Sequence, residues 1–192
     1  MKCKLIVIEG IDNVGKTSSA RLLVDRLLSR GISAIYYKTP PEQFAETTRV
    51  INEMASRDAH FLYHAAMVKY AESQVAQIMM DKTVVCDRWF FSTYAYHAAA
   101  GSQLRLHWKN LMELEPDHAF LLTVDSEDER IKRALKKKGY VEKHDLLTKS
   151  DAPLLEQAEI ILRSAGLEHI NTTNLSLEGV VDVMFHQVIS NI

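Results

Sequence analysis

Short apolar runs and amphipathic segments alternate along the whole chain. Five runs rich in β-branched and aromatic residues predict strands at 4–9, 33–38, 83–87, 119–124 and 168–171. Between them, apolar positions recur at the three- and four-residue spacing of an amphipathic helix. The helices expected from this spacing are 16–30, 42–55, 58–80, 102–114, 126–138, 153–165 and 176–190. Ser126 and Ser176 stand where helix N-caps are expected.

The predicted strands are apolar throughout, which is typical of a parallel sheet covered by helices on both faces. The chain has 192 residues and shows no repeat or inter-domain linker, so we expect a single α/β domain over 1–192. The segment 134–153 differs from its surroundings, because it is charged, contains Gly139 and Pro153 and has no clear period. This composition is typical of a surface lid.

The first predicted strand leads directly into a glycine-rich loop that opens a helix. The loop reads GIDNVGKT from Gly10 to Thr17 and fits the phosphate-binding pattern G-x-x-x-x-G-K-[ST]. Its glycines let successive N–H groups point inward, Lys16 places a charge beside the β- and γ-phosphates, and the Thr17 hydroxyl can bind Mg²⁺. The residues expected to bind a nucleoside triphosphate are Gly10, Asn13, Val14, Gly15, Lys16, Thr17 and Ser18.

Asp12 lies inside this anion-binding loop, where a carboxylate opposes phosphate binding. It either caps a turn or faces a second ligand beside the nucleotide. Asp87 ends the third predicted strand and so reaches the carboxyl edge of the sheet, where it can hold Mg²⁺ or orient an acceptor. Arg88 follows with a bidentate fork suited to an anionic acceptor. The aromatic residues of WFFSTYAY, 89–96, suit a flat base, with some of the rings in the core.

The amino-acid composition limits the kinds of binding partner and the location that we expect for the chain. The net charge is −2, so nothing drives the whole chain toward nucleic acid or an anionic membrane. No apolar run is long enough for a membrane span, and the two cysteines suggest reduced thiols, so we expect a cytoplasmic protein. His60 and His64 have the i, i+4 spacing of metal ligands, but no third ligand accompanies them in the sequence. We expect them to pack on the helix surface.

Two motifs together resemble the thymidylate kinase family. IVIEGIDNVGKTSSARLL and VVCDRWFFSTYAY are similar to its first loop and to the Asp-Arg motif after its third strand. PDHAFLLTVDSEDERIKR at 116–133 and HINTTNLSLEGVVDVMFHQV near the end resemble its later segments more weakly. The resemblance covers most of the chain. It implies a P-loop NTPase fold and the conversion of dTMP to dTDP with ATP and Mg²⁺, in a homodimer.

The resemblance also implies roles for single residues. Lys16 and Thr17 would meet the ATP phosphates and Mg²⁺, Asp12 the acceptor sugar hydroxyl, and Arg88 the acceptor phosphate, with Asp87 supporting the metal. Arg133 would bind the cofactor, and lid lysines at 136, 137, 138 and 143 would neutralise the transferring group. The expected acceptor-binding residues are Asp12, Arg88, Ser92, Thr93, Tyr96, Phe61 and Met67.

The chain departs from the family pattern at three places. Met67 stands where the family places an arginine that touches the acceptor, Lys38 replaces an arginine after the second strand, and the lid has KHD at 143–145 instead of Asp-Arg. A different nucleotide or an unphosphorylated nucleoside is therefore an alternative acceptor.

Two other classes of protein compete with a kinase. A GTP-binding switch would read guanine with TKSD at 148–151, but no apolar strand directly precedes that segment. A P-loop protein that binds nucleotide without transferring phosphate is the third alternative, and Met67 is its best support.

Overall fold

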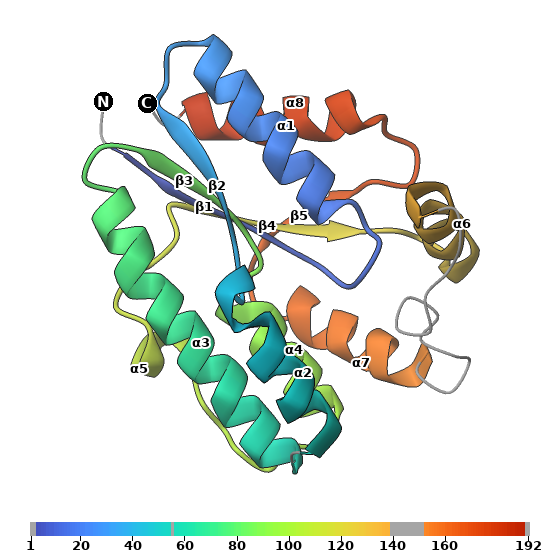
Figure 1. Cartoon of the computed structure of the whole chain (residues 1–192). Coiled ribbons are helices and arrows are strands. Elements are labelled where there is room, and N and C mark those ends of the chain that lie inside the picture. The colour runs from blue at the N-terminus through green and yellow to red at the C-terminus, as the bar shows by residue number, and fades with distance from the viewer. Residues whose placement is uncertain (1–2, 55, 139–151, 191–192) are drawn as a thin grey trace.

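The computed structural model describes residues 3–54, 56–138 and 152–190. Its centre is a five-stranded sheet, and every neighbouring pair of strands is parallel (Figure 1). The strands lie in the order β2-β3-β1-β4-β5. They are β1 (Leu5–Glu9), β2 (Ala34–Lys38), β3 (Thr83–Asp87), β4 (His118–Thr123) and β5 (Glu168–Asn171). The α/β class, the five strands and the parallel sheet predicted from the sequence are confirmed.

Helices cover both faces of the sheet. α1 (Lys16–Ser29) and α8 (Leu177–Ser190) lie together on one face, and α3 (Arg57–Ile78), α4 (Phe90–Ala99) and α7 (Ala152–Arg163) lie on the other (Figure 1). The remaining helices are the short 3₁₀ turn η1 (Glu42–Phe44), α2 (Ala45–Met54), α5 (Trp108–Leu111) and α6 (Glu127–Lys138). Among the described residues, no helix is long and apolar enough to cross a membrane.

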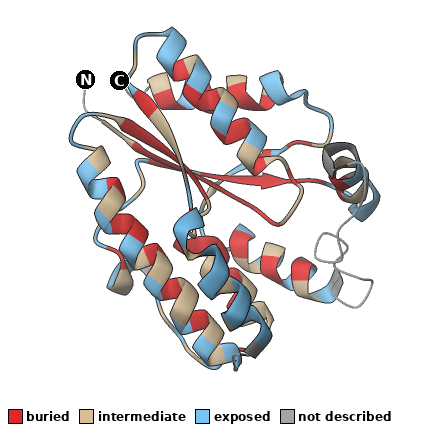
Figure 2. Ribbon diagram, in the orientation of Figure 1, coloured by how far each residue is buried: buried red, intermediate tan, exposed pale blue. Residues whose placement is uncertain are grey.

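The core forms where the sheet meets these helices. Every residue of β1 and β3 is buried, because each strand has neighbours on both sides and helices above and below (Figure 2). Ser126 and Ser176 are the N-caps that the sequence predicts: their hydroxyls accept hydrogen bonds from the N–H groups of Glu129 at 3.2 Å and Gly179 at 3.1 Å.

Helix α4 was not expected from the sequence, which shows only a strand followed by an aromatic cluster. The buried carboxylate of Glu9 stabilises its first turn. One oxygen accepts hydrogen bonds from the N–H groups of Trp89 at 2.8 Å and Ser92 at 3.3 Å, and the other accepts one from the Ser92 hydroxyl. A carboxylate at a helix N-terminus satisfies N–H groups that have no partner within the helix. β1 thus holds the start of α4 in place.

The helix expected over 102–114 is wrong; only α5 forms there. Side chains of α3 satisfy the polar groups of this segment in an irregular conformation. Asp58 accepts from Gln103 N at 3.1 Å, and Glu72 accepts from the backbone N–H groups of Glu113 and Leu114, both at 2.6 Å. These bonds replace the helical ones.

Most of the expected lid, 134–153, lies outside the described residues. Helix α6 ends at Lys138 and α7 begins at Ala152, with 139–151 between them. The lid lysine at 143 and the TKSD segment at 148–151 fall in this interval, so both interpretations stay predictions.

Candidate active site

The loop between β1 and α1 has the backbone conformation that its glycines permit. Gly10 has φ of 143°, and a Cβ built on it would lie 2.4 Å from the carbonyl oxygen of Leu122 in β4. Gly15, with φ of 105°, is the residue before α1. Side chains rarely adopt such backbone angles, so the loop depends on glycine at these two positions. The loop leads directly into the N-terminus of α1, and the free N–H groups of a helix N-terminus attract anions.

A cavity of about 690 Å³ lies at the carboxyl edge of the sheet, above β1 and β3. The parallel register pairs Ile8 with Asp87, so the loops after β1 and β3 begin at the same level. The cavity is lined by Asp12, Asn13, Val14, Gly15, Lys16, Thr17, Ser18, Ser19, Lys38, Asp87, Arg88, Glu129, Lys132, Arg133, Thr172, Leu175, Leu177 and Val180.

Lys16 is the most deeply buried cation of this cavity. Its Nζ donates a 2.6 Å hydrogen bond to the carbonyl oxygen of Ile11. Burial and the nearby positive charge of Arg88 lower the pKa of Lys16 to about 8, although Asp12 and Asp87 act in the opposite direction. The lysine is therefore a charge that titrates close to neutral pH.

Thr17 and Asp87 form a pair of oxygen donors at the floor of the cavity. The Thr17 hydroxyl donates a 2.6 Å hydrogen bond to Oδ2 of Asp87, and the Tyr36 hydroxyl donates one of 3.1 Å to the same atom. Burial, followed by the charge of Asp87, raises the pKa of Tyr36 to about 12. A hydroxyl and a carboxylate side by side are hard ligands of the type that Mg²⁺ takes, so these residues fit that ion.

Arg88 and Asp12 form an ion pair that joins the two loops. Arg88 adopts a left-handed backbone conformation, φ 73°, directly after β3, and its guanidinium lies over the ring of Tyr96, 5.4 Å from the centroid. Burial alone would raise the pKa of Asp12, but the charges of Arg88 and Lys16 outweigh it and the pKa is lowered. Asp12 is thus a carboxylate held between two cations rather than the cap of a turn.

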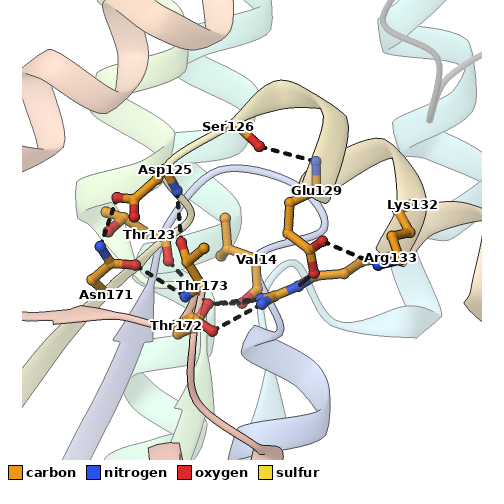
Figure 3. A network of polar contacts seen from close by, with 10 residues as sticks. All are labelled: Val14, Thr123, Asp125, Ser126, Glu129, Lys132, Arg133, Asn171, Thr172 and Thr173. Atoms are coloured by element: carbon orange, nitrogen blue, oxygen red, sulfur yellow. Dashed lines mark hydrogen bonds and ion pairs between the residues drawn. The ribbon is translucent and has the colours of Figure 1, made fainter.

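Arg133 is fixed at the opposite end of the cavity by a network of polar contacts (Figure 3). Its Nη1 donates to the Thr172 hydroxyl at 2.7 Å, its Nη2 to the Thr172 carbonyl at 2.8 Å, and its Nε to Glu129 at 3.1 Å. Nη1 also lies 3.5 Å from the carbonyl oxygen of Val14 in the glycine-rich loop. The contacts tie α6 to the segment after β5 and to the loop, and they hold the guanidinium in one orientation.

Most of the expected site residues meet at this cavity. Asp12, Asn13, Val14, Gly15, Lys16, Thr17, Ser18, Asp87, Arg88 and Arg133 all line it. Gly10 lies behind the loop against Leu122.

Of the residues expected to bind an acceptor, Asp12 and Arg88 line this cavity, whereas the others do not: Ser92, Thr93, Tyr96, Phe61 and Met67. Phe61 is fully buried, and Ser92 is 3% exposed with its hydroxyl on Glu9. Both belong to the core around α4, and their proposed roles in the acceptor site stay predictions. Met67, Thr93 and Tyr96 are partly exposed, and their proposed roles stay predictions.

The sequence also left several lining residues unassigned. Lys38, noted there only as a departure, ends β2 at the same edge as Asp87. Thr172 follows the last strand directly, so its position at the carboxyl edge of the sheet could have been predicted from the sequence. The other unassigned lining residues are Ser19, Glu129, Lys132, Leu175, Leu177 and Val180.

The fold and the cavity define a P-loop phosphotransferase: a glycine-rich loop, oxygen donors for a metal and a second cationic group share one site. The family model for thymidylate kinase matches residues 8–174, and the chain belongs to the thymidylate kinase family.

Similar proteins are found among both curated sequences and solved structures. The probable thymidylate kinase of Methanocaldococcus jannaschii is 32% identical, over 91% of this chain and 90% of the relative. The thymidylate kinase of Desulfotalea psychrophila is 28% identical, over 89% and 86%. The solved thymidylate kinase of Candida albicans has a TM-score of 0.75 at 17% identity, covering 99% of this chain and 92% of that one, so it shows the shared fold.

Proposed function

We propose that this protein transfers the γ-phosphoryl group of ATP to dTMP and forms dTDP and ADP, with Mg²⁺ as the metal. The observation that carries the proposal is the meeting of Lys16, the Thr17–Asp87 pair and the Asp12–Arg88 pair at one cavity. Family membership supplies the substrate class, because the relatives described above bear the name thymidylate kinase.

The donor half of the site is the loop together with α6 and the start of α8. Loop N–H groups and Lys16 would bind the β- and γ-phosphates, and Thr17 with Asp87 would hold Mg²⁺. The adenine base would lie between Arg133, whose guanidinium is held by Thr172, and the apolar side chains of the segment after β5. Those side chains are Leu175, Leu177 and Val180.

The acceptor half is the side of the cavity toward Arg88. The two terminal guanidinium nitrogens of Arg88 match the spacing of phosphate oxygens, and the ion pair with Asp12 orients the guanidinium. Asp12 also lies 3.5 Å from the Tyr96 hydroxyl, which places a carboxylate and a phenol where a sugar hydroxyl can reach them.

Phosphoryl transfer needs alignment and charge neutralisation more than covalent help. An oxygen of the acceptor phosphate attacks the γ-phosphorus in line, and the bond from that phosphorus to the bridging oxygen of ADP breaks. Lys16 and Arg88 flank the position where charge accumulates. Mg²⁺ at Thr17 and Asp87 would neutralise the β- and γ-oxygens.

The proposal is tested by incubating the protein with ATP and Mg²⁺ and a panel of dTMP, dUMP, dCMP and thymidine. We expect dTDP as the main product. Thymidine converted to dTMP would instead show a nucleoside kinase, the alternative that Met67 leaves open. ATP binding without any product would show a nucleotide-binding protein that transfers nothing.

The homodimer implied by the resemblance and the cytoplasmic location expected from the composition are proposed with this function. Sedimentation of the purified chain in the absence of nucleotide tests the first, and we expect the mass of two chains.

A further inference from the structure

Three histidines meet between α3 and α4, outside the cavity described above. His60 and His64 lie one turn apart on α3, and His97 comes from α4. One ring nitrogen from each of the three residues lies within 4.8 Å of the others. The ring centroids are 4.6 Å apart for His60 and His64, and 4.8 Å for His60 and His97. The third ligand that the sequence did not show is therefore supplied by a helix 33 to 37 positions further along the chain.

The hydrogen bonds of His97 determine where its proton lies. Nδ1 of His97 is 2.5 Å from the carbonyl oxygen of Thr93, one turn earlier in α4. A carbonyl oxygen can only accept, so this nitrogen carries the hydrogen. In the neutral ring, Nε2 then bears a lone pair, and it points at Nδ1 of His60 at 2.6 Å.

His60 has a matching outer contact. Its Nε2 is 2.6 Å from Oδ1 of Asn52, so with the amide oxygen in this position Nε2 donates and Nδ1 also bears a lone pair. Two lone pairs facing each other at 2.6 Å repel unless a cation lies between them. Outer partners that hold a histidine by its remote nitrogen are also the usual surroundings of metal-binding imidazoles.

The surroundings of the three histidines determine which class of cation the cluster can bind. Burial lowers the pKa of all three histidines, that of His64 to about 4, and neutral imidazole is the form that binds metal ions. No carboxylate or thiol of the described residues belongs to the cluster. Imidazole nitrogens without oxygen donors suit Zn²⁺, Cu²⁺, Ni²⁺ and Co²⁺ and do not suit Mg²⁺ or Ca²⁺.

We propose that His60, His64 and His97 form a binding site for a divalent transition metal ion, with Zn²⁺ the ion that best fits three imidazoles. A tetrahedral ion with Zn–N bonds of about 2.0–2.1 Å separates its ligand nitrogens by about 3.3 Å. The pair at 2.6 Å must therefore open by about 0.7 Å, and the nitrogen spacings that reach up to 4.8 Å must close. The fourth position is left for water.

The site would join two helices that also touch through aromatic side chains. His97 stacks on Phe61 of α3, with 5.0 Å between the ring centroids. Coordination bonds to the metal would add to this contact. α4 begins two residues after Arg88, so an ion here would stiffen the helix pair next to the proposed acceptor half.

Spectroscopy on the full chain, prepared without an affinity tag and freed of metal, tests the proposal. Co²⁺ is titrated in excess Mg²⁺, which occupies oxygen sites and leaves imidazoles free. We expect one Co²⁺ per chain with the visible absorption of a tetrahedral nitrogen site, displaced by Zn²⁺, and a higher Tm in the presence of Zn²⁺. His64→Gln and His97→Gln should each weaken binding at least about tenfold. His186→Gln, on the exposed side of α8, is the matched control and should bind like the wild type.

Two results would overturn the proposal. The first is a wild-type chain, folded by circular dichroism, that takes up no Co²⁺. This outcome would mean that the Asn52 amide is rotated and that His60 simply donates a hydrogen bond to His97. The second is uptake that persists unchanged in the His64→Gln, His97→Gln double variant, which would place the ion elsewhere.

Discussion

Arg88 and Asp12 form an ion pair between the loops that follow β3 and β1. The two residues are distant in sequence but adjacent in space, because β1 and β3 are neighbours in the sheet and end at the same edge. This ion pair explains why a carboxylate can lie inside an anion-binding loop. In the proposed function, Asp12 orients Arg88 and does not bind the ATP phosphates.

Arg88→Ala should separate phosphoryl transfer from ATP binding. In the proposed function, Arg88 belongs to the acceptor half of the cavity, and Lys16 and Thr17 belong to the donor half. We expect the rate of transfer to fall by roughly 10³-fold or more, with ATP affinity nearly unchanged. Rapid-quench kinetics and a fluorescent ATP analogue measure the two quantities. Arg49→Ala, on the surface of α2, should leave both unchanged. A large loss of ATP affinity in Arg88→Ala would show that the arginine belongs to the donor half.

ATP affinity should weaken as pH rises above about 8. Burial and Arg88 lower the pKa of Lys16 to about 8, so the free protein loses this proton there, while phosphate binding requires the charged amine. Binding then takes up a proton, and the Kd should rise by up to tenfold per pH unit beyond that point. Calorimetry between about pH 7 and 10 tests this slope.

Two variants test whether Lys16 causes this pH dependence of ATP affinity. Removing Arg88 removes a repulsive charge, so Arg88→Ala should move the change in slope to higher pH. Lys16→Met should bind weakly and show no change in slope. An affinity independent of pH in the wild type would mean that Lys16 keeps its proton throughout.

Glu9 links β1 to α4, and its replacement should destabilise the fold. Glu9→Ala leaves the N–H groups of Trp89 and Ser92 and the Ser92 hydroxyl without their acceptor, which should lower the free energy of unfolding by about 2–4 kcal/mol. Urea unfolding measures the loss. Glu178→Ala, on the exposed first turn of α8, is the control for removal of a carboxylate and should cost less than about 1 kcal/mol.

The charge of Glu9 adds a pH dependence to this stability. Burial raises the folded-state pKa of Glu9, partly offset by its hydrogen bonds. The folded protein keeps the proton after the unfolded chain has lost it, so the contribution of Glu9 to stability declines as pH rises from the unfolded value of about 4.5 through the folded pKa. Glu9→Gln cannot ionise and should lack this decline. Parallel curves for the two proteins over that pH range would contradict the account.

Gly10→Ala should destabilise the protein through the loop. A Cβ at this position would lie 2.4 Å from the Leu122 carbonyl oxygen, and φ is 143°. We expect a loss of about 2–4 kcal/mol in the free energy of unfolding, and weaker ATP binding. Gly31→Ala has a positive φ of 74° but no atom within 4 Å of the new Cβ, so it isolates the cost of backbone strain. Equal losses in the two variants would show that the close approach to β4 has no effect.

Local patterns in the sequence were sufficient for the sheet and for the glycine-rich loop before α1. Hydrophobic runs gave the strands, and the spacing of Gly10, Gly15 and Lys16 gave the loop. Asp87 and Arg88 followed from their place at the end of a strand, since parallel strands bring their carboxyl ends to one edge.

The remaining features depend on contacts between distant segments. The aromatic residues after Arg88 have strand propensity, yet they form α4 because Glu9, about 80 residues earlier, satisfies its first turn. Residues 102–114 have helical spacing, yet most of them form no helix because α3 supplies hydrogen bonds to their backbone. The pairing of His97 with His60 likewise spans 37 positions. No local pattern contains this information.

The central claim is that one cavity aligns ATP with a nucleoside monophosphate, and the direct measurement is the stoichiometry of transfer to dTMP. Protein, ATP, Mg²⁺ and dTMP are incubated together, and ADP and dTDP are quantified by chromatography, with Arg88→Ala in parallel. The account predicts equal amounts of dTDP and ADP from the wild type and almost none from the variant. ADP without dTDP, or equal dTDP from both proteins, would contradict it.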